Sequence, residues 1–173
     1  MFLTDLKADG GITYLEYTGK YGEPLWHFGE GLSYSNISET WTDRTRHHQN
    51  LTTRELRTDS LTRSRVTVVH KFSVAVENQG MVVTDHVVLC FLASNHTRAF
   101  ANKKLVNFGR MASLQPGERR IIELELLSEQ VALPDASGVM HVYPGAYSVL
   151  LGDVAEPLTA SFVLQGHASV LSH

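Results

Sequence analysis

The sequence predicts an all-β fold, an antiparallel β-sandwich of about seven strands with an irregular N-terminal extension. From residue 66 onward, apolar and polar residues alternate in several short runs, as they do in strands with one buried face. Turns rich in proline and glycine separate these runs. No stretch after residue 65 has the apolar period of a helix of convincing length. Together these patterns favour two packed sheets.

The first predicted strand begins at Val66. Its buried face would be formed by every second side chain, namely Val66, Val68, His70, Phe72, Val74 and Val76. A turn at Asn78, Gln79 and Gly80 follows. We expect His70 to be a core histidine rather than a metal ligand.

The run from His86 to Leu92 is apolar on both faces. This suits a central strand that is covered on both sides, or one whose outer side meets another domain. The single cysteine, Cys90, lies within this run and should be a buried, inert thiol.

The remaining strands are each bounded by a turn or a polar loop, and we expect them at 105–114, 119–126, 144–151 and 158–164. Gly145 and Tyr147 open the third of these. Tyr147 is a candidate tyrosine corner, in which the hydroxyl binds nearby backbone, so we expect both residues to be structural.

Length and composition are those of one ordinary globular domain, with 173 residues and a net charge of -3. Nothing in them suggests nucleic acid, and no run of apolar residues is long enough for a membrane span. The amino terminus lacks the apolar core of a signal peptide. Three glycosylation sequons, at Asn36, Asn50 and Asn95, lie in polar stretches and favour a secreted or vacuolar protein.

The least regular segment runs from Pro24 to Tyr34. It interleaves large apolar side chains with glycines after a proline, so it can be neither a regular helix nor a good central strand. Such a loop has too much apolar surface to lie in water. It either covers the protein's own core or joins this domain to a partner domain.

This segment resembles a motif of glycoside hydrolase family 3, the β-glucosidases and β-xylosidases. In that family, Pro-Leu-aromatic-Pro-Phe-Gly-His-Gly-Leu-Ser-Tyr marks the passage from the catalytic domains into a C-terminal fibronectin-III-like domain. The sequence departs from the pattern at His27 and Glu30, and it keeps Pro24, Leu25, Trp26, Phe28, Gly29, Gly31, Leu32, Ser33 and Tyr34. The resemblance covers about residues 11 to 165 and continues through Asn78, Gly80, Val87, Val88, Leu89, Lys104, Leu105, Phe108, Leu114, Pro116, Gly117, Glu118, Pro144, Gly145, Tyr147, Val149, Leu151 and Gly152.

The resemblance implies a fibronectin-III or immunoglobulin-like sandwich attached to catalytic domains of the same parent chain. It divides the sequence into a linker and docking loop (1–38), a polar surface excursion (39–65), the sandwich (66–165) and a tail (166–173). The residues expected at the domain interface are Trp26, His27, Phe28, Leu32 and Tyr34.

The sequence carries no recognisable catalytic site. Glu123 and Glu125 are close enough to suggest the carboxyl pair of a glycosidase, but they alternate with apolar residues, as on a solvated outer face. The family's catalytic contexts are absent, so no catalytic residue can be assigned. The adjacent His47 and His48 point in different directions and lack further ligands, so we expect no metal and no cofactor.

Two functions remain open. The first is a non-catalytic accessory domain of a family 3 β-glucosidase or β-xylosidase, which would be inactive alone and would stabilise the catalytic domains. The alternative is a free-standing module that binds polysaccharide or protein, with Trp26 and Trp41 as the available sugar platforms. An intact small hydrolase is the least favoured.

Overall fold

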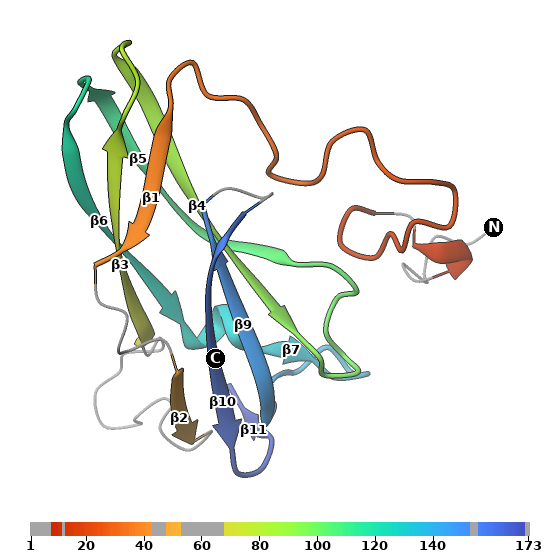
Figure 1. Cartoon of the computed structure of the whole chain (residues 1–173). Coiled ribbons are helices and arrows are strands. Elements are labelled where there is room, and N and C mark those ends of the chain that lie inside the picture. The colour runs from red at the N-terminus through yellow and green to blue at the C-terminus, as the bar shows by residue number, and fades with distance from the viewer. Residues whose placement is uncertain (1–7, 12, 43–47, 53–67, 153–155, 172–173) are drawn as a thin grey trace.

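The body of the protein is a β-sandwich (Figure 1). The computed structural model describes residues 8–11, 13–42, 48–52, 68–152 and 156–171. One main sheet contains, in spatial order, β1 (Ile37–Trp41), β3 (Val68–Asn78) and β6 (Arg119–Leu127). The other contains β2 (His48–Thr52), β10 (Leu158–Gln165), β9 (Gly145–Leu151), β4 (Thr84–Ser94) and β5 (Lys104–Leu114).

Smaller elements complete the described chain. A short sheet of β11 (Ser169–Val170), β8 (Met140–Val142) and β7 (Leu133–Pro134) lies beside the main sheets. The helical elements are one-turn pieces, η1 (Ala8–Gly10) and α1 (Ser128–Val131). All strand pairs in the described residues are antiparallel except β2 with β10. The predicted all-β antiparallel sandwich is therefore confirmed.

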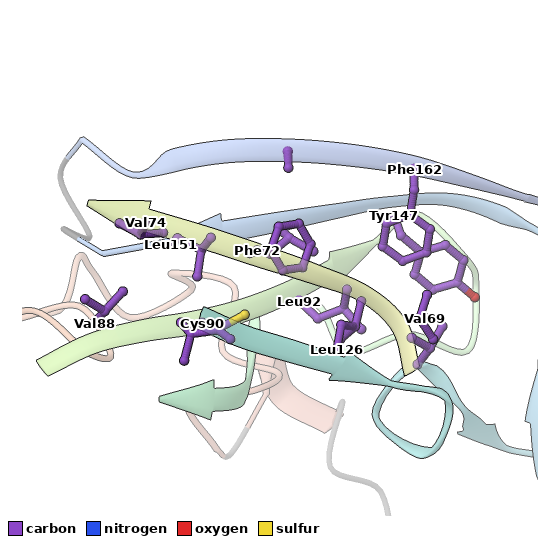
Figure 2. Close-up of a cluster of buried hydrophobic side chains, with 14 of the residues drawn as sticks. Val69, Phe72, Val74, Val88, Cys90, Leu92, Leu126, Tyr147, Leu151 and Phe162 are labelled. Atoms are coloured by element: carbon purple, nitrogen blue, oxygen red, sulfur yellow. The ribbon is translucent and has the colours of Figure 1, made fainter. Parts of the chain in front are cut away.

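The core lies between the two main sheets (Figure 2). Alternate side chains of β3, β4, β6 and β9 meet there and are at most 2% exposed, among them Phe72, Val74, Val88, Cys90, Leu126, Tyr147 and Leu151. Across β9 and β10, the rings of Tyr147 and Phe162 stack with centroids 5.2 Å apart. Burial raises the pKa of the Cys90 thiol to about 12, so it is a buried and unreactive cysteine, as predicted.

Strand β3 departs from the predicted alternation at its start. Its register against β6 shifts between Val68 and His70. Val69 is therefore buried, whereas Val68 is 40% exposed, so the predicted inward position of Val68 was wrong. A bulge adds one residue to the strand and reverses the faces beyond it, which a strict period of two cannot anticipate. His70 is half-buried and meets Phe72 edge-on, and Val66 lies outside the described residues.

Strand β2 and most of β1, which begins at Ile37, lie in the stretch that we expected to be a polar surface excursion (39–65). Strand β1 pairs with β3 and places Trp41 beside Phe72 in the core, with ring centroids 6.0 Å apart. Strand β2 pairs with β10. The charged Glu39 lies between Ile37 and Trp41 and interrupts the apolar alternation. The sequence pattern therefore does not predict strand β1. Similarly, β11 lies in the expected tail, while residues 43–47 and 53–67 are outside the described chain.

Candidate functional site

The segment from Pro24 to Tyr34, called the docking segment below, carries a set of exposed apolar side chains. Leu25 is 95% exposed, Trp26 61%, Leu32 87% and Tyr34 92%. These side chains therefore do not cover the protein's own core. The segment belongs to an N-terminal stretch that extends to one side of the sandwich (Figure 1).

Phe28 is the side chain through which the docking segment contacts the sandwich. Its ring stacks on Tyr14 with centroids 4.1 Å apart and meets Phe91 of β4 edge-on at 5.7 Å. Gly29 lies so close to β4 that a Cβ atom there would be 2.5 Å from the Phe91 ring, and its φ of 85° suits glycine. Phe91 is consequently 1% exposed. The outer side of β4 is thus covered here, as the apolar run from His86 to Leu92 predicts.

Hydrogen bonds tie the stretch before the docking segment to the loop between β4 and β5. The Asn102 side-chain amide donates to the carbonyl oxygens of Tyr14 and Tyr17, at 2.7 Å each. The buried Glu16 carboxylate accepts a bond of 3.1 Å from the Ala101 backbone N–H. These contacts hold the N-terminal stretch against the sandwich independently of the Phe28 ring.

The two departures from the family motif form a tight turn. The backbone N–H of His27 donates to the Glu30 carboxylate at 2.8 Å, and the Glu30 N–H donates to the His27 carbonyl at 2.9 Å. The carboxylate therefore satisfies a backbone group that a proline at position 27 would not present. His27 itself is exposed, beside Phe28 and Lys103, in an open groove of about 540 Å³.

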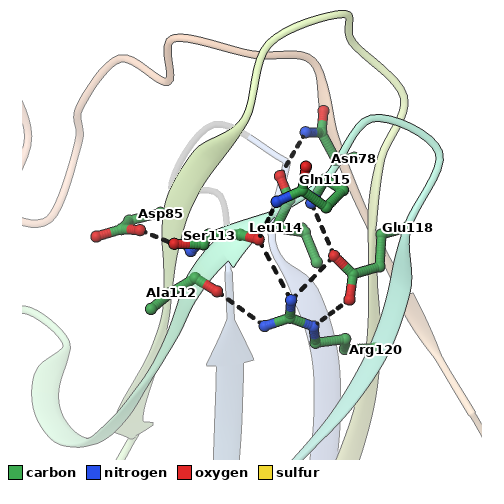
Figure 3. Close-up of polar contacts among 8 residues, drawn as sticks. All are labelled: Asn78, Asp85, Ala112, Ser113, Leu114, Gln115, Glu118 and Arg120. Carbon is green, nitrogen blue, oxygen red and sulfur yellow. Dashed lines mark hydrogen bonds and ion pairs between the residues drawn. The ribbon is translucent and has the colours of Figure 1, made fainter.

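The C-terminal end of the docking segment is fixed by a buried asparagine. The hydroxyl of Ser35 donates to Asn78 Oδ1 at 2.6 Å. The Asn78 amide donates in turn to the carbonyl oxygens of Val82 and Leu114, at 2.8 and 2.9 Å (Figure 3 shows the Leu114 bond). Asn78 is 0% exposed. The segment is thus attached to the sandwich at Phe28 and Gly29 in its middle and through Ser35, the residue that follows it. The apolar side chains on either side of Phe28 stay exposed.

An ion pair that the sequence did not indicate joins the two main sheets. Glu39 Oε1 of β1 lies 2.7 Å from His86 Nε2 of β4, and their side chains are 9% and 19% exposed. Gly152 leaves room for it, since a Cβ atom there would be 1.4 Å from Glu39 Oε2. The pair lines an open groove of about 630 Å³, whose other side includes Gly31 and Leu32 of the docking segment.

The other predicted site residues are the tyrosine corner and the glycosylation sequons. Tyr147 donates its hydroxyl to the Tyr143 carbonyl at 2.8 Å, which is the contact that a tyrosine corner requires. Burial raises the pKa of Tyr147 to about 12. Gly145 has a φ of 152°, which L side chains rarely adopt. Among the sequons, Asn36 and Asn95 are exposed, whereas Asn50 lies in strand β2 rather than in a connecting stretch.

The carboxyl pair and the histidines considered in the sequence do not form a catalytic or metal site in the residues that the structure describes. Glu123 and Glu125 lie on the outer side of β6, and Glu125 pairs with Lys71 at 2.6 Å. No group of His, Cys, Asp and Glu in that part of the chain is placed to hold a metal ion. Its helices are also too short and too polar to cross a membrane. His47 lies outside the described residues.

Sequence reasoning missed several residues that shape this region. Tyr14 and Asn102 attach the N-terminal stretch to the sandwich. Nothing in the sequence around either residue indicates that they are in contact. The three successive apolar residues Met81, Val82 and Val83 did carry a signal, because three apolar residues inside a connecting turn are unusual there.

Comparisons with known proteins agree with this architecture. Residues 86–155 match the family model of the fibronectin type III-like domain. The probable exo-1,4-beta-xylosidase of Aspergillus terreus is 27% identical over 155 residues, which cover 88% of this chain and 19% of that enzyme. The exo-1,4-beta-xylosidase of Aspergillus oryzae is 30% identical over 170 residues, which cover 95% of this chain and 21% of that enzyme.

Solved structures give the same result. A GH3 exo-beta-xylosidase bound to a xylobiose aziridine activity-based probe has a TM-score of 0.81 and 25% identity, covering 94% of this chain and 21% of that chain. A beta-glucosidase from Kluyveromyces marxianus shares the fold with a TM-score of 0.66 and 20% identity, covering 91% of this chain and 17% of that chain.

The sandwich contains, over residues 86–155, a match to the fibronectin type III-like domain model. More narrowly, it is similar to the C-terminal region of glycoside hydrolase family 3 xylosidases and glucosidases, which confirms the resemblance found in the sequence motifs. The chain spans about a fifth of the length of the curated relatives that it matches, and these relatives are fungal xylosidases.

Proposed function

We propose that the chain is the non-catalytic accessory domain of a family 3 glycoside hydrolase, and that its docking segment packs against the catalytic domains of the same polypeptide. The observation that carries this proposal is the exposure of Trp26, Leu32 and Tyr34 on a segment that is attached to the sandwich at Phe28 and through the following Ser35. An exposed apolar cluster held in place is typical of a surface that another body covers.

The energetic gain from covering this segment would be large. Burying one large apolar side chain contributes about 1.5–3 kcal/mol, and the docking segment offers several. Because the segment is already ordered by Phe28 and Ser35, docking would cost little further conformational entropy. The accessory domain would therefore stabilise the catalytic domains that it contacts.

Hydrolysis would be carried out by the catalytic domains and not by this chain. A retaining glycosidase needs two facing carboxyl groups about 5 Å apart, whereas the pair considered in the sequence, Glu123 and Glu125, lies on the outer side of β6, with Glu125 paired to Lys71. The substrates of the parent enzyme would be terminal β-xylosides first and β-glucosides second, because the matched curated relatives are exo-1,4-beta-xylosidases. A secreted or vacuolar location, with glycans on Asn36 and Asn95, would suit the exposure of both asparagines.

A second candidate is a polysaccharide-binding module. Trp26 is 61% exposed and could stack on a sugar ring. Trp41 could not, since it packs against Phe72 on the core side of β1. The platform would then rest on Trp26 and its neighbours in the docking segment.

The test uses the full 173-residue chain. As a probe we choose the Aspergillus oryzae exo-xylosidase produced without the part that matches this chain. We expect the chain to bind this probe, and Trp26→Asp or Tyr34→Asp to weaken binding at least tenfold (about 1.4 kcal/mol). Ile121→Asp, on the outer side of β6, is the matched control because Ile121 is also an exposed apolar residue.

Two results would overturn this proposal. One is turnover of aryl β-xyloside or β-glucoside by the chain alone. The other is a lack of binding to the probe combined with retention on insoluble xylan or cellulose, which would favour the second candidate.

A further inference from the structure

A second exposed apolar surface lies in the connection between β3 and β4. Met81 is 94% exposed, Val82 56% and Val83 48%. We call these three residues the β3–β4 tip. Isolated exposed apolar residues are normal on a protein surface, but three in succession on a turn form a patch that favours contact with another body.

The tip is held in one conformation. The Asn78 amide donates to the Val82 carbonyl at 2.8 Å, and Asn78 Oδ1 accepts a bond of 3.0 Å from the Gly80 backbone N–H. Because Asn78 is buried, these bonds are shielded from water. The turn is therefore ordered, and Met81 and Val82 are exposed on it.

The tip is also fixed relative to the docking segment. Ser35, the residue after Tyr34, donates to the same Asn78 side chain. The Gln79 backbone N–H donates to the Asn36 carbonyl at 2.8 Å. Gly80 packs so closely that a Cβ atom would be 2.1 Å from the Ser35 hydroxyl. The tip and the end of the docking segment are therefore held next to each other, although about fifty residues separate them in sequence.

We propose that the β3–β4 tip is a second part of the interface with the catalytic part of the same polypeptide. This inference rests on the proposed function. A stable interface buries about 800 Å² on each partner and involves roughly 20–30 residues, which is more than the docking segment alone provides. The occupant would be large, because the chain spans about a fifth of its curated relatives and the rest of their length could cover both surfaces.

The experiment compares four variants of the full chain for binding to the truncated Aspergillus oryzae exo-xylosidase described above. Met81→Asp and Val83→Asp alter the tip, Trp26→Asp alters the docking segment, and Ile121→Asp is the control. We expect each tip variant to weaken binding at least fivefold and the control to leave it unchanged. Thermal unfolding of each isolated variant should match the unsubstituted chain, since all four side chains are exposed.

The outcomes separate this inference from the proposed function. Binding that Trp26→Asp weakens and the tip variants do not would overturn the role of the tip alone. Failure of the unsubstituted chain to bind would overturn both. Self-association of the chain in light scattering, lost in Met81→Asp, would assign the tip to a second copy and would also overturn the inference.

Discussion

Phe28 of the docking segment meets Phe91 of β4 edge-on, with ring centroids 5.7 Å apart and ring planes inclined by 77°. On its other side Phe28 stacks on Tyr14. This single ring therefore joins the N-terminal stretch to the outer face of the five-stranded sheet. The remaining large side chains of the segment stay free to face another surface.

Replacing Phe28 with alanine should release the docking segment without unfolding the sandwich. Aromatic pairs contribute about 0.5–1.5 kcal/mol beyond the area that they bury, and Phe28 is itself 38% exposed. We expect faster amide hydrogen exchange over residues 24–34 and almost no change in β3, β4 and β9. Leu25→Ala is the control, because Leu25 is 95% exposed and should change neither. Equal protection of the segment in both variants would contradict the anchoring role.

Asn78 should be among the most sensitive polar positions. Its side chain makes bonds to Ser35, Gly80, Val82 and Leu114 from a fully buried site. Asn78→Ala would leave buried backbone groups without partners, at a cost of about 1–3 kcal/mol for each such group. We expect urea unfolding to show a loss of about 2–4 kcal/mol. The neighbouring Gln79→Ala, on an exposed side chain, should cost less than about 0.5 kcal/mol.

Gly152 should be restricted to glycine by the ion pair that it faces. Its φ is 78°, and a Cβ atom would overlap the Glu39 carboxylate. Gly152→Ala should therefore displace Glu39 from His86 and destabilise the fold by about 1–3 kcal/mol. The same substitution in a Glu39→Ala background should cost about 1 kcal/mol less, because the overlapping group is gone. Additive costs in the double variant would show that the carboxylate is not the obstacle.

The sequence predicted those parts of the fold that follow from alternation along one strand. Strands β3, β4, β6, β9 and β10 and the burial of Cys90 could be anticipated in this way. Strand β1 could not, because the partly buried Glu39 carboxylate is hydrogen-bonded by His86, a residue 47 positions away. The reversed faces of Val68 and Val69 depend on a bulge whose position is set by packing.

The sequence could predict which residues form the candidate site, but not how they are attached to the sandwich. The apolar content of the docking segment indicated that it contacts something. Which of its rings faces inward is decided by Phe91, and this depends on the pairing of distant strands. That the β3–β4 tip lies close to the end of the docking segment likewise emerges only after Asn78 joins Ser35 to Val82.

The turn between β5 and β6 should make stability depend on acid pH through Glu118. Its carboxylate is bound by the Arg120 guanidinium and accepts a bond from the Gln115 backbone N–H (Figure 3). The hydrogen bond from Arg120, followed by that from Gln115, lowers the pKa of Glu118 below its ordinary value of 4.5. A carboxyl group whose pKa is lower in the folded state stabilises the fold above the unfolded-state pKa, and this contribution disappears as the pH falls through the folded-state pKa.

Glu118→Gln should therefore lower the Tm at pH 7 and have progressively less effect below about pH 4.5, where the unfolded-state carboxyl becomes protonated. The measurement is the Tm difference between the variant and the unsubstituted chain from pH 7 down to about pH 2. Glu123→Gln is the matched control, since Glu123 is an exposed carboxyl on β6. A difference that stayed constant over this range would mean that the side chain acts through packing or neutral hydrogen bonds rather than through its charge.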